Sequence, residues 1–187
     1  MITRTLLALL CTLFVGSSFV SQAATPQKRD HLNEKEVDLV KEAQALDKRI
    51  DVFIKAAERR LMVINGSSGA NAKQLKKDSE RWGELPTGSR AELVADIARI
   101  FDEAITNIDD VSARDERNPL ISKSLRKLAQ SVNTIMTQLK PLSAQVKGDA
   151  EVASFELLNE DAQSILEAVN KLPPEVVDKK AKKNDKN

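Results

Sequence analysis

The sequence predicts an all-α fold: an antiparallel four-helix bundle with a short connector helix and a disordered basic C-terminal tail. Apolar residues recur three and four positions apart along the chain, and no stretch alternates apolar and polar residues as a strand would. Tyrosine is absent, and six glycines and six prolines among 187 residues leave long segments without helix breakers. Four amphipathic segments separated by turn residues favour one bundle over residues 33–172.

The first long helix is predicted over residues 33–64. Asn33 and Glu36 have the spacing of a capping box, in which each side chain binds the other residue's backbone N–H. Apolar positions then continue to Ile64, and the Asn-Gly-Ser-Ser-Gly run at 65–69 ends them. At 1.5 Å per residue this helix would be about 48 Å long. Part of its apolar side would then extend past the other helices and be open to a partner.

The other helices are bounded by the same kinds of signal, after a short connector helix expected over residues 73–82. The second long helix begins with a capping box at Ser89 and Glu92. The third begins with the N-cap and proline pair Asn118-Pro119 and is expected to end at Pro141. The fourth begins near Asp149 and ends before Pro173-Pro174. Residues 173–187 form a Lys-rich tail with almost nothing to bury, which is typical of disorder.

Charge predicts the order of the helices in the bundle. Residues 119–147 hold five basic and no acidic side chains. Residues 89–118 hold four basic and eight acidic ones, and residues 149–174 hold one basic and six acidic ones. Since like charges disfavour a pairing, the third long helix is expected beside the second and fourth, and diagonal to the first.

The N-terminus has the three parts of a secretory signal peptide. Arg4 precedes an apolar run over residues 6–15, and the small residues Ser21 and Ala23 stand where a signal peptidase reads. The run is short for a membrane anchor, which needs about 20 apolar residues. We therefore expect residues 1–23 to be removed, residues 24–32 to form a flexible lead-in, and the protein to be exported, either periplasmic or secreted.

The mature chain would contain no cysteine, because Cys11 lies in the signal peptide, so no disulfide can form. Its formal net charge would be zero, which argues against nucleic acid as a partner. No transmembrane segment would remain. His31 is the single histidine and is taken as an exposed side chain, and no metal-ligand or cofactor motif accompanies it.

Two groups of residues are the candidates for a site. Trp82 and Leu85 form an aromatic and apolar cluster outside the helical seams, which either stacks a ligand or partner or covers one end of the bundle. The acidic turn Asp109, Asp110, Asp115 and Glu116 has the oxygen ligands that calcium prefers, but it lacks the alternation and glycine of a calcium loop. We expect no catalytic residue, cofactor or metal.

The runs 82–86 (Trp-Gly-Glu-Leu-Pro), 102–111 and 125–129 resemble a group of exported bacterial all-helical proteins with no assigned activity. The resemblance implies an exported compartment and no mechanism. The leading hypothesis is a non-enzymatic helical interaction or structural protein of the bacterial cell envelope, with an unknown protein partner. The alternatives are a small-ligand carrier that uses the bundle interior and an enzyme with a carboxylate-based site. Oligomeric state is left open.

Overall fold

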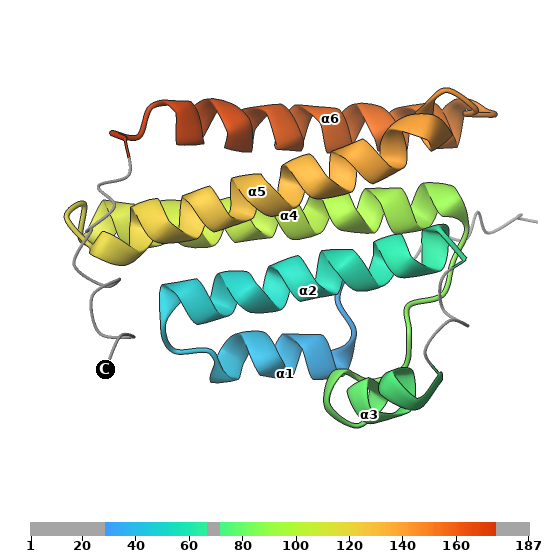
Figure 1. The fold of residues 1–187 in the computed structure, drawn as a ribbon, viewed down its shortest axis with the longest axis horizontal. Coiled ribbons are helices and arrows are strands. Elements are labelled where there is room, and N and C mark those ends of the chain that lie inside the picture. The colour runs from blue at the N-terminus through green and yellow to red at the C-terminus, as the bar shows by residue number, and fades with distance from the viewer. Residues whose placement is uncertain (1–28, 67–71, 175–187) are drawn as a thin grey trace, which may run out of the picture.

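The computed structural model describes residues 29–66 and 72–174, which form six α-helices and no strand (Figure 1). The predicted all-α fold is confirmed. The helices are α1 (Glu34–Glu42), α2 (Leu46–Ile64), α3 (Ala72–Trp82), α4 (Arg90–Arg114), α5 (Pro119–Ser143) and α6 (Asp149–Asn170). The predicted signal peptide at 1–23 and residues 175–187 of the predicted tail lie outside the described residues. None of the described helices is long and apolar enough to cross a membrane.

The helix starts agree with the capping signals in the sequence. Asn33 and Glu36 form both hydrogen bonds of a capping box at the start of α1, and Ser89 and Glu92 do the same at α4. The Asn118 side chain accepts a hydrogen bond from the first turn of α5. Each cap satisfies backbone N–H groups that have no partner inside the helix.

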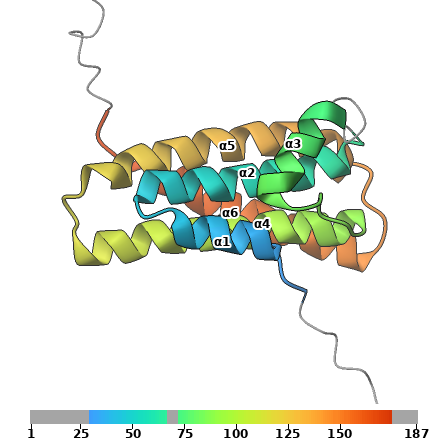
Figure 2. The ribbon, with the colours of Figure 1, turned by 90° about the horizontal axis from the view of Figure 1, so that it is seen from below.

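The prediction of a single long helix over residues 33–64 is wrong, because the segment forms two helices, α1 and α2. The backbone leaves helical geometry at Ala43, where ψ is 89°, and the chain folds back so that α1 lies antiparallel to α2 (Figures 1 and 2). No glycine or proline marks this break. The reversal buries Leu39 against the same protein, whereas a straight helix would have left it in water. The overhanging apolar side that argued for a partner is therefore absent.

Four helices, α2, α4, α5 and α6, lie side by side around one core (Figures 1 and 2). Ile50, Ile97, Leu128 and Leu158, one from each helix, have no exposed surface. α2 and α6 each contact both α4 and α5, while α4 and α5 contact each other less, across the diagonal. α1 packs on α2, and α3 packs on α1.

The predicted order of helices is wrong in part. α5 packs beside α6, as expected, but its other neighbour is α2, and it lies diagonal to α4. Lys123 Nζ lies 2.7 Å from Asp47 Oδ2, and Lys127 pairs with Asp51, both across the α2–α5 contact. The net charge of a whole segment does not predict such ion pairs between single residues. Each exposed pair contributes only about 0–1 kcal/mol, so charge was too weak to prevent α4 and α6, both net acidic, from packing together.

A fully antiparallel arrangement is not what the contacts show, since two neighbouring pairs run parallel. α2 and α5 run the same way, with contacts from Asp47 to Lys123 near their starts and from Asn65 to Gln138 near their ends. α4 and α6 also run the same way, as Figure 1 shows. The short turn after α4 therefore joins two helices that face each other diagonally.

Pro141 does not end the third long helix. α5 continues through it to Ser143. A proline this close to a C-terminus removes only one backbone hydrogen bond, and the affected carbonyl belongs to Thr137, which is exposed to water.

Candidate functional site at Trp82

Trp82 stands where α3 ends and the connector to α4 begins. Gly83 follows it with φ at +72°, a left-handed conformation that glycine adopts without a Cβ penalty. Its N–H donates to Ser79 O at 3.0 Å, which closes the end of α3. A Cβ at Gly83 would lie 3.3 Å from the Lys35 side chain of α1, so the turn also sits close against its neighbour.

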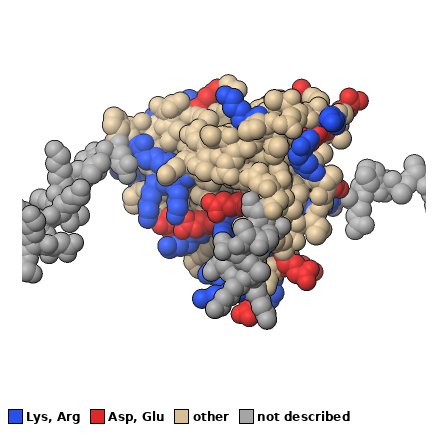
Figure 3. All heavy atoms as spheres, turned by 45° about the vertical axis from the view of Figure 1, so that its right-hand side comes forward, with Lys and Arg blue, Asp and Glu red and all other residues tan. Residues whose placement is uncertain are grey.

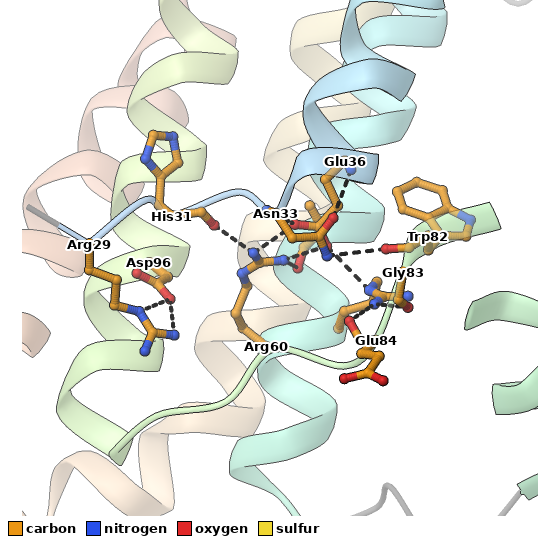
Figure 4. Close-up of polar contacts among 11 residues, drawn as sticks. Arg29, His31, Asn33, Glu36, Arg60, Trp82, Gly83, Glu84 and Asp96 are labelled. Carbon is orange, nitrogen blue, oxygen red and sulfur yellow. Dashed lines mark hydrogen bonds and ion pairs between the residues drawn. The ribbon is translucent and has the colours of Figure 1, made fainter. Parts of the chain in front are cut away.

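Side chains from α1 and α2 hold this turn in place (Figure 4). The N-cap residue Asn33 donates from Nδ2 to Trp82 O at 3.1 Å. Arg59 of α2 donates from Nη2 to Gly83 O at 2.9 Å and to Glu84 O at 2.6 Å. The backbone around Trp82 is thus fixed by groups 24 to 49 residues away in sequence.

Beneath the turn lies a buried cluster of three charged side chains, Glu36, Arg59 and Arg60. Their exposed fractions are 0%, 3% and 2%. Arg60 Nη1 and Nη2 each lie 2.7 Å from one oxygen of Glu36, a bidentate ion pair. Arg59 Nε lies 3.2 Å from Glu36 Oε1. Burial lowers the pKa of the Arg59 guanidinium, while the Glu36 carboxylate works in the opposite direction.

The Trp82 ring lies beside Arg59 at the edge of this cluster and lines a surface groove of about 560 Å³. Leu39, Ala43 and Val52 supply the apolar lining. The rest of the lining is polar or charged, from Glu42, Gln44, Lys48, Asp51 and Arg81. The guanidinium carbons of Arg59 and Arg81 lie 5.9 and 6.0 Å from the ring centroid, within the range of a cation–π contact.

The lining of this groove is suited to binding. It offers an aromatic ring, an apolar surface and charges of both signs.

Leu85, predicted to act together with Trp82, faces a different hollow. It is half-buried and lines a space of about 450 Å³ with Arg29 and Arg60. The two residues of the predicted cluster therefore line different hollows.

The lead-in before α1 contributes contacts that sequence reasoning missed. His31, expected to be exposed, has a side chain only 27% exposed, and its Nε2 lies 2.7 Å from Glu103 Oε2. Arg29 donates to Asp96 Oδ2 from Nε at 3.2 Å and from Nη2 at 2.9 Å. Burial raises the pKa of Asp96, and the Arg29 guanidinium counteracts the rise. Residues 29–32 are thus packed along α4.

The buried arginines were also missed, although the sequence holds a signal for one of them. Arg60 follows Phe53 and Ala57 at the seven- and three-residue spacings of the buried side of the helix. A cation at such a position needs a buried anion. The capping role of Glu36 accounted for its place in the sequence, so the sequence did not indicate that Glu36 also pairs with Arg60.

The four acidic turn residues are all exposed and lie in the last turns of α4 or just after it. Asp109 and Asp110 lie in the last turns of α4, and Asp115 donates its backbone N–H to Val111 O as the C-cap. Within the described residues there is no group of three or more His, Cys, Asp or Glu side chains that could hold a metal ion.

One carboxylate has a strongly raised pKa. Partial burial on α6, together with Asp102 of α4 and the adjacent Glu160, raises the pKa of Asp161 to about 6. Asp102 and Glu160 are exposed, and none of the three lines the grooves at Trp82 or Leu85.

Comparison with known proteins identifies no matching family, no similar curated protein and no similar solved structure.

Proposed function

We propose that this chain is a non-enzymatic interaction protein of the bacterial cell envelope, exported by residues 1–23 and built on a four-helix bundle. The observation that carries the proposal is the position of Trp82. Its backbone is held by Asn33 and anchored through Arg59, while its ring borders an open groove. Preorganised aromatic side chains beside arginines are the common anchors of protein interfaces.

The form of the groove favours a protein segment as its occupant. The apolar strip from Leu39, Ala43 and Val52 is short, and charged side chains of both signs surround it. An apolar centre with a polar, solvated rim is the usual anatomy of an interface between proteins.

The two alternatives have less support. A carrier that uses the bundle interior needs an enclosed cavity of at least about 300 Å³. The hollows at Trp82 and Leu85 open to solvent, and the core side chains of the four helices are buried among one another. A carboxylate-based enzyme needs two carboxyl groups facing each other across a cleft. Asp161, whose pKa is raised, does not line the grooves at Trp82 or Leu85. Acidic side chains do line the hollow beside His31, namely Asp30, Glu34, Asp38 and Glu103.

Capture from a cell-envelope extract, with the exported protein as bait, tests the proposal. We expect Trp82→Ala to lose a captured protein that the wild type retains. Leu157→Ala, which removes a 38%-exposed side chain of α6, is the matched control and should retain it. Trp82 is the only tryptophan, so the purified partner should also change the emission of the protein on titration.

Equal capture by the wild type and Trp82→Ala would refute the role of the groove. The compartment is tested separately by N-terminal sequencing of the exported protein, which should begin at Ala24 or Thr25. A chain that still begins at Met1 would refute processing.

A further inference from the structure

The sequence contains a single Asn-Gly pair, Asn65-Gly66, and it stands where α2 ends. Asparagine followed by glycine is prone to lose its side-chain amide, because the backbone nitrogen of the next residue attacks the amide carbon. Glycine has no Cβ to hinder that approach. The other asparagines in the described ranges precede glutamate, isoleucine, proline, threonine or lysine. Among them, the sequence therefore favours Asn65 for this reaction.

The backbone at this pair is open to rotation. Asn65 is the exposed C-cap of α2, with φ at −79° and ψ at 0°. Attack requires ψ to rotate away from this value, so that the Gly66 nitrogen approaches Asn65 Cγ. Gly66 is also exposed, at φ +65°, and a Cβ placed on it would have no atom within 4 Å. Neighbouring atoms therefore do not block the rotation.

The hydrogen bonds that oppose this rotation all lie at the end of the helix. Gly66 N–H donates to Val63 O at 3.0 Å. Asn65 Nδ2 donates to Gln138 Oε1 of α5 at 3.2 Å, an exposed bond. Breaking these two bonds is a local opening that leaves the buried side chains of α2 in place. Because each bond protects the pair only modestly, we expect the folded protein to react about 10- to 100-fold more slowly than the unfolded chain.

We infer that Asn65 is a site of spontaneous deamidation in the folded protein. In the first step the Gly66 nitrogen bonds to Asn65 Cγ and the Cγ–Nδ2 bond breaks. The proton of the Gly66 N–H leaves with the amide group as ammonia. Water then opens the succinimide ring. Cleavage at Cγ gives aspartate, and cleavage at the backbone carbonyl carbon of residue 65 gives isoaspartate. Water is the co-reactant, and both residues are exposed to it.

Either product places a carboxylate where the structure holds an amide. A helix C-terminus carries partial negative charge, so a carboxylate there is unfavourable. The Asn65 Nδ2 donor is lost, and carboxylate oxygens then face Gln138 Oε1. Isoaspartate also adds a carbon to the main chain, which displaces the Gly66 N–H from Val63 O. Deamidation is therefore expected to loosen the contact between the end of α2 and α5.

The new charge falls on a part of the surface with few charges. Asn65 lines a groove of about 460 Å³ between α2 and α5, in which the described lining has two charged side chains, Glu58 and Lys127. Lys127 is already paired with Asp51. Residues 128–139 of α5 contain no Asp, Glu, Lys or Arg. Figure 3 shows a broad area without charged side chains across the upper middle of the molecule. Deamidation therefore makes this groove more acidic.

Peptide mapping by mass spectrometry tests the inference. The full chain is incubated in its native state at mildly alkaline pH, with a parallel sample in urea. Asn170, which is exposed at the last residue of α6 and is followed by Lys171, is the matched control within the same molecule. We expect Asn65 to convert to aspartate and isoaspartate about tenfold or more faster than Asn170 in the native sample, and faster still in urea.

Two variants separate the chemistry from its consequence. Gly66→Ala should slow conversion at Asn65. The left-handed φ strains alanine and loosens the turn, which by itself would speed the reaction, so slower conversion is assigned to the added Cβ. Asn65→Asp reproduces one product and should lower the thermal midpoint by a few degrees.

Equal conversion at Asn65 and Asn170 in the native sample overturns the inference. Conversion at Asn65 in urea alone also overturns it, as does conversion that is not slowed by Gly66→Ala. An unchanged midpoint for Asn65→Asp overturns the expected loosening of the α2–α5 contact.

Discussion

Removal of the Glu36 charge should destabilise the protein more than any other single change of an acidic side chain in the described structure. Glu36 is completely buried and lies within ion-pair distance of both Arg59 and Arg60. The substitution Glu36→Gln keeps the shape of the side chain. It leaves two guanidinium groups buried side by side without the carboxylate that pairs with both.

The expected cost follows from the contacts that remain. Breaking a buried ion pair by removing one partner costs about 3–5 kcal/mol. Arg60 keeps the carbonyls of His31 and Ala56, and Arg59 keeps those of Gly83 and Glu84, so the lower end of that range applies. We expect Glu36→Gln to lower the free energy of unfolding by about 3 kcal/mol.

Glu36→Ala should lower the free energy of unfolding by about 1 kcal/mol more than Glu36→Gln does, because it also breaks the capping box with Asn33. The double variant Glu36→Gln/Arg60→Met should recover part of the loss, since it removes one of the uncompensated charges.

Urea unfolding followed by far-UV circular dichroism measures these differences directly. The matched control is Glu34→Gln, an exposed acid in the same first turn of α1, which should change stability by less than about 0.5 kcal/mol. If Glu36→Gln costs no more than this control, the buried arginines do not depend on Glu36 and the reasoning is refuted.

Two further predictions concern the helices around the core. The pKa of Asp161 is raised to about 6 from its ordinary 3.8, so ionisation of this group opposes folding at pH 7. Asp161→Asn should therefore stabilise the protein by about 1 kcal/mol at pH 7, after allowing for solvent screening. The gain should fade as the pH falls from about 6 to about 4, and Asp109→Asn serves as the exposed control in thermal melts. Leu128→Ala should cost about 3–5 kcal/mol in urea unfolding because Leu128 has no exposed surface, and a cost below about 1 kcal/mol would contradict the described core.

Features that depend on neighbours a few residues apart could be predicted from the sequence. The capping boxes at Asn33 and Ser89 need only a residue three positions on, so they form in any tertiary setting that keeps the helix. The same holds for the start of α5 at Asn118, whose side chain caps the first turn.

Part of the candidate site was also predictable. Trp82 stood out because no other tryptophan or tyrosine occurs in the chain. Its support was not predictable, since Asn33 and Arg59 reach it from 49 and 23 positions away along the chain. Leu85 lines a different hollow from Trp82, since proximity in sequence across a turn does not by itself place two side chains on one surface.

The sequence by itself determined the helical class, because its apolar period is 3.6 residues, and the positions where most helices begin, because caps are local. Only the tertiary structure decided that α1 folds back on α2, that α5 packs beside α2, and that Glu36 lies between two buried arginines. The physical reason is that apolar helix faces fit one another about equally well, and exposed charges contribute too little to choose among them. The choice is made by the closest packing of the whole core and by the cost of leaving buried charges unpaired.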